Sequence, residues 1–337
     1  MPLNRRQLLQ ATALGVAGSG LQACSGDEFP LKPDDNYPRG DFGADSTAEE
    51  VTQGLSLSDR TVLVTGCTSG LGFETMRVLA LRGAHVIGTG RTLEKAKQAC
   101  ISVEGQATPV ALELADFQSA VDCVATIRDM DLVPDIVICN AGINTFGELE
   151  LIGGIERIFR VNFLGHFVLV NQLLPLMSVA GGRIVHVGSR SGYMQAPAVG
   201  IDFDNLRGEG LFDSGEAYGR SKLANALFSF ALARRLEGSK LTSNVIHPGL
   251  VKTNIARTAP TLIRGAFDLF GGLIAKTPEQ GAATQVYVAT SEALAGVNGA
   301  YFEDCNPVVV LGEHHMYNDA MGEQLWATAE VMTEGFT

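Results

Sequence analysis

A glycine-rich turn between a strand-like run and a helical pattern constrains this fold most strongly. Residues 61–65 have the composition of a short strand, glycines follow at positions 66, 70 and 72, and the apolar residues within 73–81 have helical spacing. Gly66 would permit the sharp turn, Gly70 would let backbone amides at the helix N-terminus approach a pyrophosphate, and Gly72 would let the helix pack close to the strand. A tight loop between two core elements is the alternative interpretation.

Strand-like and helix-like segments alternate along the rest of the chain, which predicts βαβ units. The strand-like runs lie at 61–65, 84–88, 108–112, 135–139, 183–187 and 242–246, and a seventh is expected at 307–311. The pattern indicates a single-domain, Rossmann-type α/β fold with a doubly wound parallel sheet of about seven strands and helices on both faces. We place this domain at residues 42–337.

The composition argues against nucleic acid and metal as partners. Apolar residues make up 46% of the 337 residues, which is ample for a core, and the net charge is −12. A phosphate backbone attracts Lys and Arg, so this acidic balance disfavours nucleic acid. The cysteines and histidines, including the pair His314-His315, lack the spacing of metal ligands.

The N-terminal 41 residues differ from the rest of the chain. Asn4-Arg5-Arg6-Gln7-Leu8-Leu9 matches a twin-arginine export signature, and the apolar run over 11–21 is too short to span a membrane. The run ends in Gln22-Ala23-Cys24, which is similar to the lipid-attachment motif of bacterial lipoproteins; a plain cleavable signal is the alternative. We expect a signal peptide over 1–24 and a polar, flexible tether over 25–41. The expected location is the bacterial cell envelope or periplasm, with the cytoplasm as the alternative.

Tyr218 and Lys222 stand four residues apart in a stretch, 217–236, whose apolar residues have helical spacing. The two side chains therefore project from one face of a helix, one turn apart. A phenol with a pKa of about 10 is a poor proton donor or acceptor at neutral pH until a nearby ammonium stabilises its phenolate. Lys222 would supply that charge, which predicts an acid–base group that acts on an oxygen atom.

With these two motifs the chain resembles the short-chain dehydrogenase/reductase family, in particular the branch of retinol dehydrogenases and WW-domain-containing oxidoreductase. Residues 65–72 match the family pattern T-G-x-x-x-G-x-G, and Ser221-Lys222-Leu223-Ala224-Asn225 narrows the branch. The resemblance implies hydride transfer with a nicotinamide coenzyme, a serine that bonds the substrate oxygen, and an asparagine that anchors a water for proton relay. The implied catalytic group is Tyr218, Lys222, Ser189 and Asn162, with Ser191 as the alternative to Ser189.

The resemblance also implies where the coenzyme binds. Members that prefer NAD carry an acidic residue where Gly90 stands, whereas the Arg91 guanidinium suits a 2′-phosphate, which favours NADP over NAD. A solvated turn residue is the alternative role of Arg91. Glu113 is expected near the adenine and Thr253 at the nicotinamide carboxamide. The implied coenzyme-binding residues are Thr65, Gly66, Ser69, Gly70, Leu71, Gly72, Arg91, Glu113, Leu114, Asn140, Ala141, Gly142, Tyr218, Lys222, Pro248, Gly249, Val251 and Thr253.

We therefore predict an NADP(H)-dependent oxidoreductase that interconverts an alcohol and a carbonyl on an apolar small molecule. An apolar helical stretch over 262–274, where the family keeps its substrate lid, fits such a substrate, although packing onto the enzyme's own core explains it equally well. The alternative function is a noncatalytic nucleotide-binding envelope protein with the same fold. The sequence leaves the reaction direction and a homo-oligomer open, and it predicts membrane contact only through a lipid on Cys24.

Overall fold

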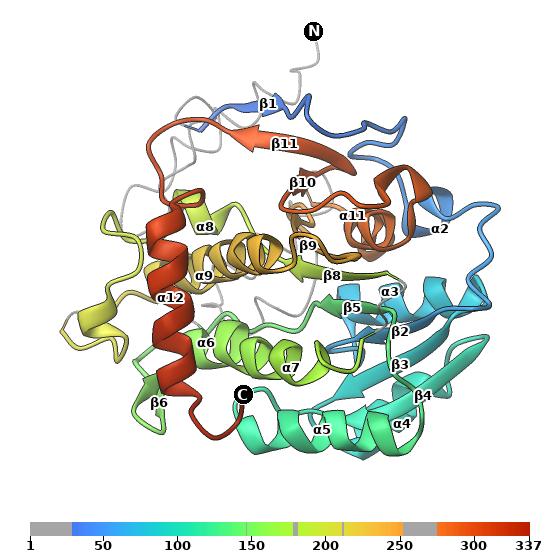
Figure 1. Ribbon diagram of the computed structural model, residues 1–337, viewed down its shortest axis with the longest axis horizontal. Helices are drawn as coiled ribbons and strands as arrows, with labels where there is room; N and C mark the ends of the chain where they lie inside the picture. The colour runs from blue at the N-terminus through green and yellow to red at the C-terminus, as the bar shows by residue number, and fades with distance from the viewer. Residues whose placement is uncertain (1–28, 146, 178–180, 211, 252–274) are drawn as a thin grey trace, which may run out of the picture.

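A nine-stranded sheet organises the computed structural model, which describes residues 29–145, 147–177, 181–210, 212–251 and 275–337. The strand order is β1-β11-β10-β9-β8-β5-β2-β3-β4, and β6 and β7 form a separate hairpin (Figure 1). The strands are β1 (Leu31–Pro33), β2 (Thr61–Val64), β3 (His85–Gly90), β4 (Gln106–Ala111), β5 (Ile136–Cys139), β6 (Leu151–Ile152), β7 (Ile155–Glu156), β8 (Gly182–Val187), β9 (Leu241–His247), β10 (Tyr301–Glu303) and β11 (Asn306–Val310).

The strands from β4 to β10 run parallel, and β11 and β1 extend the sheet with antiparallel pairing. The prediction of a doubly wound parallel sheet is thus confirmed, although two further strands raise the total to nine. The run expected as the seventh parallel strand is the antiparallel β11. Parallel pairing to β9 is made instead by the short β10, and a turn at Asp304 and Cys305, which have φ of 49° and 62°, reverses the chain into β11.

Helices cover both faces of the sheet. One core joins the sheet to α2, α3, α4 and α11, and the other joins it to α5, α7, α9 and α12. The long α12 lies across α9 (Figure 1). None of the helices in the described ranges is both long and apolar enough to cross a membrane. The helices are α2 (Ala48–Val51), α3 (Gly70–Leu81), α4 (Leu93–Cys100), α5 (Phe117–Asp129), α6 (Arg157–Phe159), a π-helix (Arg160–Leu164), α7 (Gly165–Leu173), α8 (Ser191–Met194), α9 (Ser214–Arg235), α11 (Pro278–Thr290) and α12 (Asp319–Met332), with 3₁₀ turns at Phe203–Asn205 and Glu292–Leu294.

The central strands explain why both faces must be covered. In β2, Leu63 faces one core while Val62 and Val64 face the other, because successive side chains of a strand point to opposite sides. All three are fully buried. The order of the parallel strands reverses between β2 and β5, and in such sheets ligands bind at the carboxyl ends of the strands beside that reversal.

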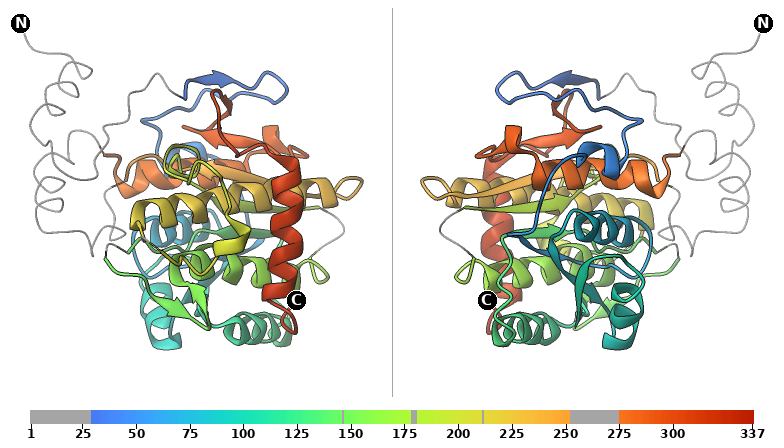
Figure 2. Two further views of the ribbon diagram at one scale, coloured as in Figure 1. Left: turned by 90° about the vertical axis from the view of Figure 1, so that its left-hand side faces the viewer. Right: turned by 90° about the vertical axis from the view of Figure 1, so that its right-hand side faces the viewer.

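Residues 29–41, the described part of the segment expected as a flexible tether, include a strand that pairs with the sheet. Leu31–Pro33 forms β1, which pairs with β11 at the end of the sheet opposite to β4 (Figure 2). The Tyr37 hydroxyl donates to the carbonyl of Asn298 at 2.9 Å. Three exposed residues that end in proline give no alternation of apolar and polar side chains, so the sequence pattern did not reveal this edge strand.

Candidate active site

A cavity of about 610 Å³ follows the carboxyl ends of the central strands. Its walls come from the glycine-rich turn after β2, the end of β3, the segment after β4 and the segment after β5. With Glu150, Ile152, Arg157 and Val161 also in its lining, it brings together residues from at least five separate parts of the sequence. The predicted coenzyme-binding residues that line it are Gly66, Ser69, Gly70, Leu71, Gly72, Arg91, Glu113, Leu114, Asn140, Ala141 and Gly142.

Two glycines of the turn are required by its geometry. Gly66 has φ of +74°, which disfavours any side chain, and a Cβ on Gly72 would lie 2.3 Å from the carbonyl oxygen of Gly66. Ser69 is the N-cap residue of α3, yet its side chain makes no capping bond to the helix. Ser69, Gly70 and Leu71 line the cavity, so the N-terminus of α3 borders it, and a helix N-terminus in such a position can hold a diphosphate.

The segment after β4, where the sequence predicts the adenine contact, lines the cavity, and Glu113 has a second role there. One carboxylate oxygen of Glu113 accepts the Ala115 amide at 3.1 Å, so this side chain also stabilises its own turn. The β6–β7 hairpin contributes Ile152 to the cavity wall, and Arg157 beside it is paired with Glu150. The sequence pattern did not reveal this wall, because two-residue strands leave no period.

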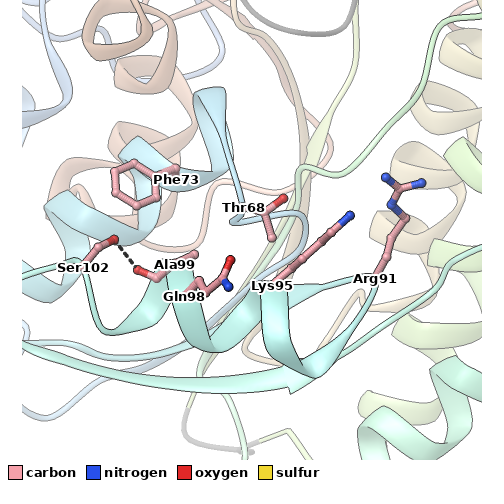
Figure 3. A pocket seen from close by; sticks show the side chains of 7 residues that line it. All are labelled: Thr68, Phe73, Arg91, Lys95, Gln98, Ala99 and Ser102. Atoms are coloured by element: carbon pink, nitrogen blue, oxygen red, sulfur yellow. Dashed lines mark hydrogen bonds between the residues drawn. The ribbon is translucent and has the colours of Figure 1, made fainter.

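A second pocket of about 410 Å³ opens beside Arg91, between α3 and α4. Figure 3 shows Arg91 and Lys95 at one end of this pocket and Phe73 and Ser102 at the other. Thr68 of the glycine-rich turn also lines it. Arg91 was predicted from its position after β3. Lys95 was not predicted, because only the structure shows that the first turn of α4 places it at this pocket.

Thr65 joins the turn after β2 to the segment after β5. Its Oγ1 accepts the amides of Asn140 and Ala141, both at 2.9 Å, and the Asn140 Nδ2 donates to the Thr65 carbonyl at 2.8 Å. Asn140 also contacts Gln285 of α11, whose Nε2 lies 3.4 Å from the Asn140 Oδ1. Gln285 is fully buried and was not predicted as part of this region.

Asn162 lies in the π-helix that interrupts the helix between α6 and α7. The amide of Gly165 bonds to the carbonyl of Arg160, five residues earlier, and such bulges are frequent at functional sites. The fully buried Asn162 side chain accepts the Ile143 amide at 2.8 Å and donates to the Ile143 carbonyl at 2.9 Å and the Ser221 Oγ at 3.0 Å. It thus links the segment after β5 to α9.

The buried His166 extends this network to Thr65. Its Nδ1 lies 3.1 Å from the Asn162 carbonyl oxygen, which can only accept, so Nδ1 carries the proton. The Nε2, 3.0 Å from Thr65 Oγ1, therefore accepts the Thr65 hydroxyl proton. Burial lowers the pKa of His166 to about 4, which keeps the ring neutral. No sequence signal pointed to this role, because a histidine in an apolar helix has the same pattern as any core residue.

Tyr218 and Lys222 lie on one face of α9, as their spacing predicts. The Lys222 Nζ is 5.7 Å from the centroid of the Tyr218 ring and donates to the Val187 carbonyl at 2.8 Å. Lys222 is 3% exposed, and burial lowers its pKa to about 8. A Cβ on Gly142 would lie 3.7 Å from Nζ, so Lys222 also borders the segment after β5.

The sequence argument expects Lys222 to lower the pKa of Tyr218, and the structure differs. Burial raises the pKa of Tyr218 to about 12, and the interaction that opposes this rise is a hydrogen bond with Ser189. The physical reason is that desolvation disfavours the phenolate while the Lys222 ammonium is bonded to the Val187 carbonyl. At neutral pH the phenol therefore keeps its proton.

Ser189, rather than Ser191, is the serine that meets Tyr218. Ser189 lies two residues after the end of β8, and its Oγ accepts the Ser191 amide at 3.2 Å and donates to the Ser191 Oγ at the same distance. Ser191 is therefore a supporting partner of Ser189. A carbonyl oxygen placed between the hydroxyls of Ser189 and Tyr218 could accept a hydrogen bond from each.

The segment after β9 closes the remaining side. Gly249 has φ of +92°. A Cβ on Gly281 would be 2.6 Å from the side chain of Val251 and 2.6 Å from that of Leu71, so these two side chains lie close to each other on either side of Gly281. Thr253 and the stretch expected as a substrate lid lie outside the described residues. Within the described ranges, the His, Cys, Asp and Glu side chains form no group of three or more that could hold a metal ion.

Known proteins of similar sequence include dehydrogenases of apolar alcohols. A family model described as short chain dehydrogenase matches residues 60–201. Human retinol dehydrogenase 14 is 37% identical over 81% of this chain and 86% of its own length. The chloroplastic short-chain dehydrogenase TIC 32 B of Brassica napus is 36% identical over 85% of this chain and 92% of its own. Human polyprenol dehydrogenase is 34% identical over 82% and 85%, respectively.

These comparisons overturn the location expected from the N-terminus. The relatives are human, mouse and Brassica napus proteins, and the Brassica napus proteins are chloroplastic by name. A bacterial envelope or periplasmic location has no support from them, and that prediction was wrong. The export signature and Cys24 lie outside the described residues. A six-residue motif next to an apolar run is short enough to occur without export.

Solved structures agree with the sequence comparisons. An uncharacterized protein of Mycobacterium paratuberculosis is 29% identical, with a TM-score of 0.67 over 84% of this chain and 97% of its own. An NAD(P)-dependent gluconate 5-dehydrogenase from Beutenbergia cavernae, described with bound NADP at low occupancy, is 27% identical with a TM-score of 0.57 over 74% and 96%. Agreement at this level over most of the chain places the protein in the short-chain dehydrogenase/reductase family, as an NAD(P)-dependent oxidoreductase that acts on CH–OH donors.

Proposed function

We propose that this enzyme interconverts an alcohol and a carbonyl on an apolar small molecule, with NADP(H) as its preferred coenzyme. The observation that carries the proposal is the 410 Å³ pocket, because the described residues that line it include Arg91 and Lys95 and no carboxylate. A 2′-phosphate placed there would be held by two cations through charge-assisted hydrogen bonds.

The space around Gly90 supports the same preference. A Cβ on Gly90 would lie 2.8 Å from the Thr68 Cγ2 and 3.1 Å from the Ala96 amide nitrogen. The acidic side chain that NAD-preferring members of the family carry here, to hold the ribose hydroxyls, therefore does not fit without movement of α4. The Beutenbergia cavernae structure with NADP bound is consistent with this preference.

The names of the relatives suggest the substrate class. Retinol and polyprenol are both long apolar alcohols, and the proteins named for them align with four fifths of this chain. We therefore propose that the substrate of this enzyme is an apolar primary alcohol or the corresponding aldehyde.

The side chains support a proton transfer coupled to hydride transfer. When bound, NADP(H) supplies or accepts the hydride. Tyr218 in its protonated form, which its raised pKa favours at neutral pH, donates its proton to the carbonyl oxygen during reduction and becomes a phenolate. In oxidation the phenolate form of Tyr218 accepts the hydroxyl proton of the alcohol, and the coenzyme accepts the hydride. Ser189 donates a hydrogen bond to the same oxygen. Lys222 contributes a positive charge beside the ring, and Asn162 holds the segment at Ile143 that borders the reacting groups.

The test compares the two coenzymes on retinol, a short polyprenol and a small polar alcohol. We expect turnover of the two apolar alcohols with NADP⁺, and kcat/KM for NADP⁺ well above that for NAD⁺. Loss of a charged phosphate contact costs about 1.5–3 kcal/mol, so Arg91→Ala or Lys95→Ala should lower kcat/KM for NADP⁺ by roughly 10- to 100-fold and leave that for NAD⁺ unchanged. Lys97→Ala is the matched control, because Lys97 is exposed on the same helix but does not line the pocket. A wild-type preference for NAD⁺, or turnover only of the polar alcohol, contradicts the proposal.

A further inference from the structure

A buried carboxylate at the end of β10 lies outside the two cavities and makes no contact with Tyr218 or Lys222. Glu303 is 3% exposed, and both of its oxygens are occupied. Its Oε2 accepts from the Arg190 Nε at 2.8 Å and from the Arg190 Nη2 at 2.6 Å. Its Oε1 accepts from the Tyr193 hydroxyl at 3.1 Å and from the Tyr301 hydroxyl at 2.6 Å. Four donors thus converge on one side chain.

The two phenols are held as donors in this cluster. Burial and the nearby Glu303 carboxylate raise the pKa of Tyr193 and of Tyr301 well above the ordinary value. Both hydroxyls therefore keep their protons at neutral pH. The hydrogen bonds to Glu303 have one direction only, and the cluster has a single arrangement of protons.

Arg190 and Tyr193 both belong to the turn that carries Ser189. Arg190 is the next residue after Ser189 and caps α8, its carbonyl accepting the amides of Tyr193 at 3.0 Å and Met194 at 2.9 Å. Tyr193 is one of the four residues of α8. The carboxylate of Glu303 is therefore hydrogen-bonded to the turn at two points, one immediately beside Ser189 and one in the helix that follows.

The turn has little freedom to move without consequence for the site. A Cβ on Gly192 would lie 2.9 Å from the Leu223 amide nitrogen and 3.0 Å from the Lys222 carbonyl carbon, so the turn packs directly on the backbone of α9. Ser189 in this turn is also the hydrogen-bond partner of Tyr218 on α9. Reacting groups have to be held within about 0.5 Å of their productive geometry, so the anchor of the turn affects the chemistry.

We propose that Glu303 is a positioning residue for the reaction: through Arg190 and Tyr193 it fixes the Ser189 hydroxyl against Tyr218. Stability alone gives little reason to bury the Glu303 carboxylate, because apolar residues of similar volume are often as stable at a buried position. The planar guanidinium fork, in contrast, sets the direction of the turn as well as its distance. The inference rests on the proposed function, in which Ser189 bonds the substrate oxygen.

The experiment compares Glu303→Gln, Arg190→Met and the double variant with the wild-type enzyme. Glu323→Gln is the matched control, because the Glu323 carboxylate likewise accepts from arginine side chains, in this case Arg234 and Arg235, but at the surface between α9 and α12. The readouts are kcat and KM for retinol at saturating NADP⁺, the Kd of NADP⁺, and hydrogen–deuterium exchange of the amides in 188–194. The exchange measurement needs no turnover, so it tests the anchor even if the proposed substrate class is wrong.

The proposal predicts that kcat falls roughly tenfold in each single variant. It should fall no further in the double variant, since both changes break the same link between Glu303 and Arg190. The Kd of NADP⁺ stays within about twofold of wild type, exchange in 188–194 accelerates, and Arg190→Lys, which keeps the charge without the fork, gives an intermediate kcat. Three results would overturn the proposal. They are an unchanged kcat and an unchanged exchange rate in Arg190→Met, effects on kcat that multiply in the double variant, and a loss of NADP⁺ affinity parallel to the loss of kcat. Because the Arg190 side chain is 47% exposed, Arg190→Met keeps the test open should Glu303→Gln not fold.

Discussion

Lys222 combines a functional charge with a cost to stability, and the structure indicates the size of that cost. The side chain is 3% exposed, and burial lowers its pKa from 10.5 to about 8. One pKa unit corresponds to about 1.4 kcal/mol, so the charged Lys222 destabilises the folded protein by about 3 kcal/mol near pH 7. Replacement by Met removes this cost, but leaves the Val187 carbonyl without its donor, which costs about 1–3 kcal/mol. We therefore expect Lys222→Met to be inactive and at least as stable as wild type near pH 7.

The pH dependence separates this effect from simple repacking. Between the folded pKa of about 8 and the unfolded value of 10.5, the unfolded chain holds the Lys222 proton and the folded protein has released it. Wild-type stability therefore rises with pH across this window relative to Lys222→Met. From about pH 7 to about pH 9.5 the advantage of the variant should shrink by about 2 kcal/mol. Tyr218 does not interfere, because its raised pKa affects stability only above about pH 10.

The assay is chemical unfolding of both proteins without coenzyme at these two pH values. All other titrations are shared by the two proteins and cancel in the difference. Lys97→Met, at an exposed position on α4, should stay within about 0.5 kcal/mol of wild type at both pH values. A variant less stable than wild type by more than about 2 kcal/mol, with the same difference at both pH values, would refute the reasoning.

Two further predictions concern the glycine-rich turn and the buried histidines. Gly72→Ala should abolish NADP⁺ binding as measured by titration, because its Cβ would lie 2.3 Å from the carbonyl oxygen of Gly66. The control variant Gly43→Ala, whose Cβ meets nothing within 4 Å, should bind NADP⁺ normally. Equal affinities of the two variants would count against the close approach of α3 to the turn. Burial lowers the pKa of His166 to about 4 and that of His186 to about 3, so the unfolded chain binds their protons first and stability should fall steadily from about pH 6.5 to about pH 4 in urea titrations. A stability that is flat across this range would contradict the buried, neutral state of both rings.

The sequence predicted the structure best where the geometry of one short segment alone determines which residues it needs. The turn over 65–72 needs glycine at positions fixed by backbone conformation and close approach, and the pair Tyr218 and Lys222 needs only helical spacing to share a face. Both requirements are local, so a single sequence is enough to place these residues on the correct elements. The parallel sheet followed for the same reason, because its buried strands are continuous apolar runs.

Features that depend on contacts between distant segments were not visible in the pattern. Lys95 joins Arg91 only through the placement of α4, and Glu303 reaches Arg190 across 113 residues of sequence. The rise of the Tyr218 pKa in the coenzyme-free protein was not visible either, because desolvation depends on the whole surrounding core, which spacing does not report. The two-residue strands β6 and β7 and the three-residue β10 are too short to produce a period.

The most direct test of the account is the turnover of Tyr218→Phe with retinol and NADP⁺. Removal of a general acid–base group typically lowers the rate by about 10²- to 10⁴-fold, so kcat should fall within that range while the Kd of NADP⁺ stays within about twofold. Phe keeps the ring and removes only the hydroxyl, which separates proton transfer from coenzyme binding. A Tyr218→Phe enzyme that retains kcat within a few-fold of wild type would contradict the central claim that this phenol carries the proton.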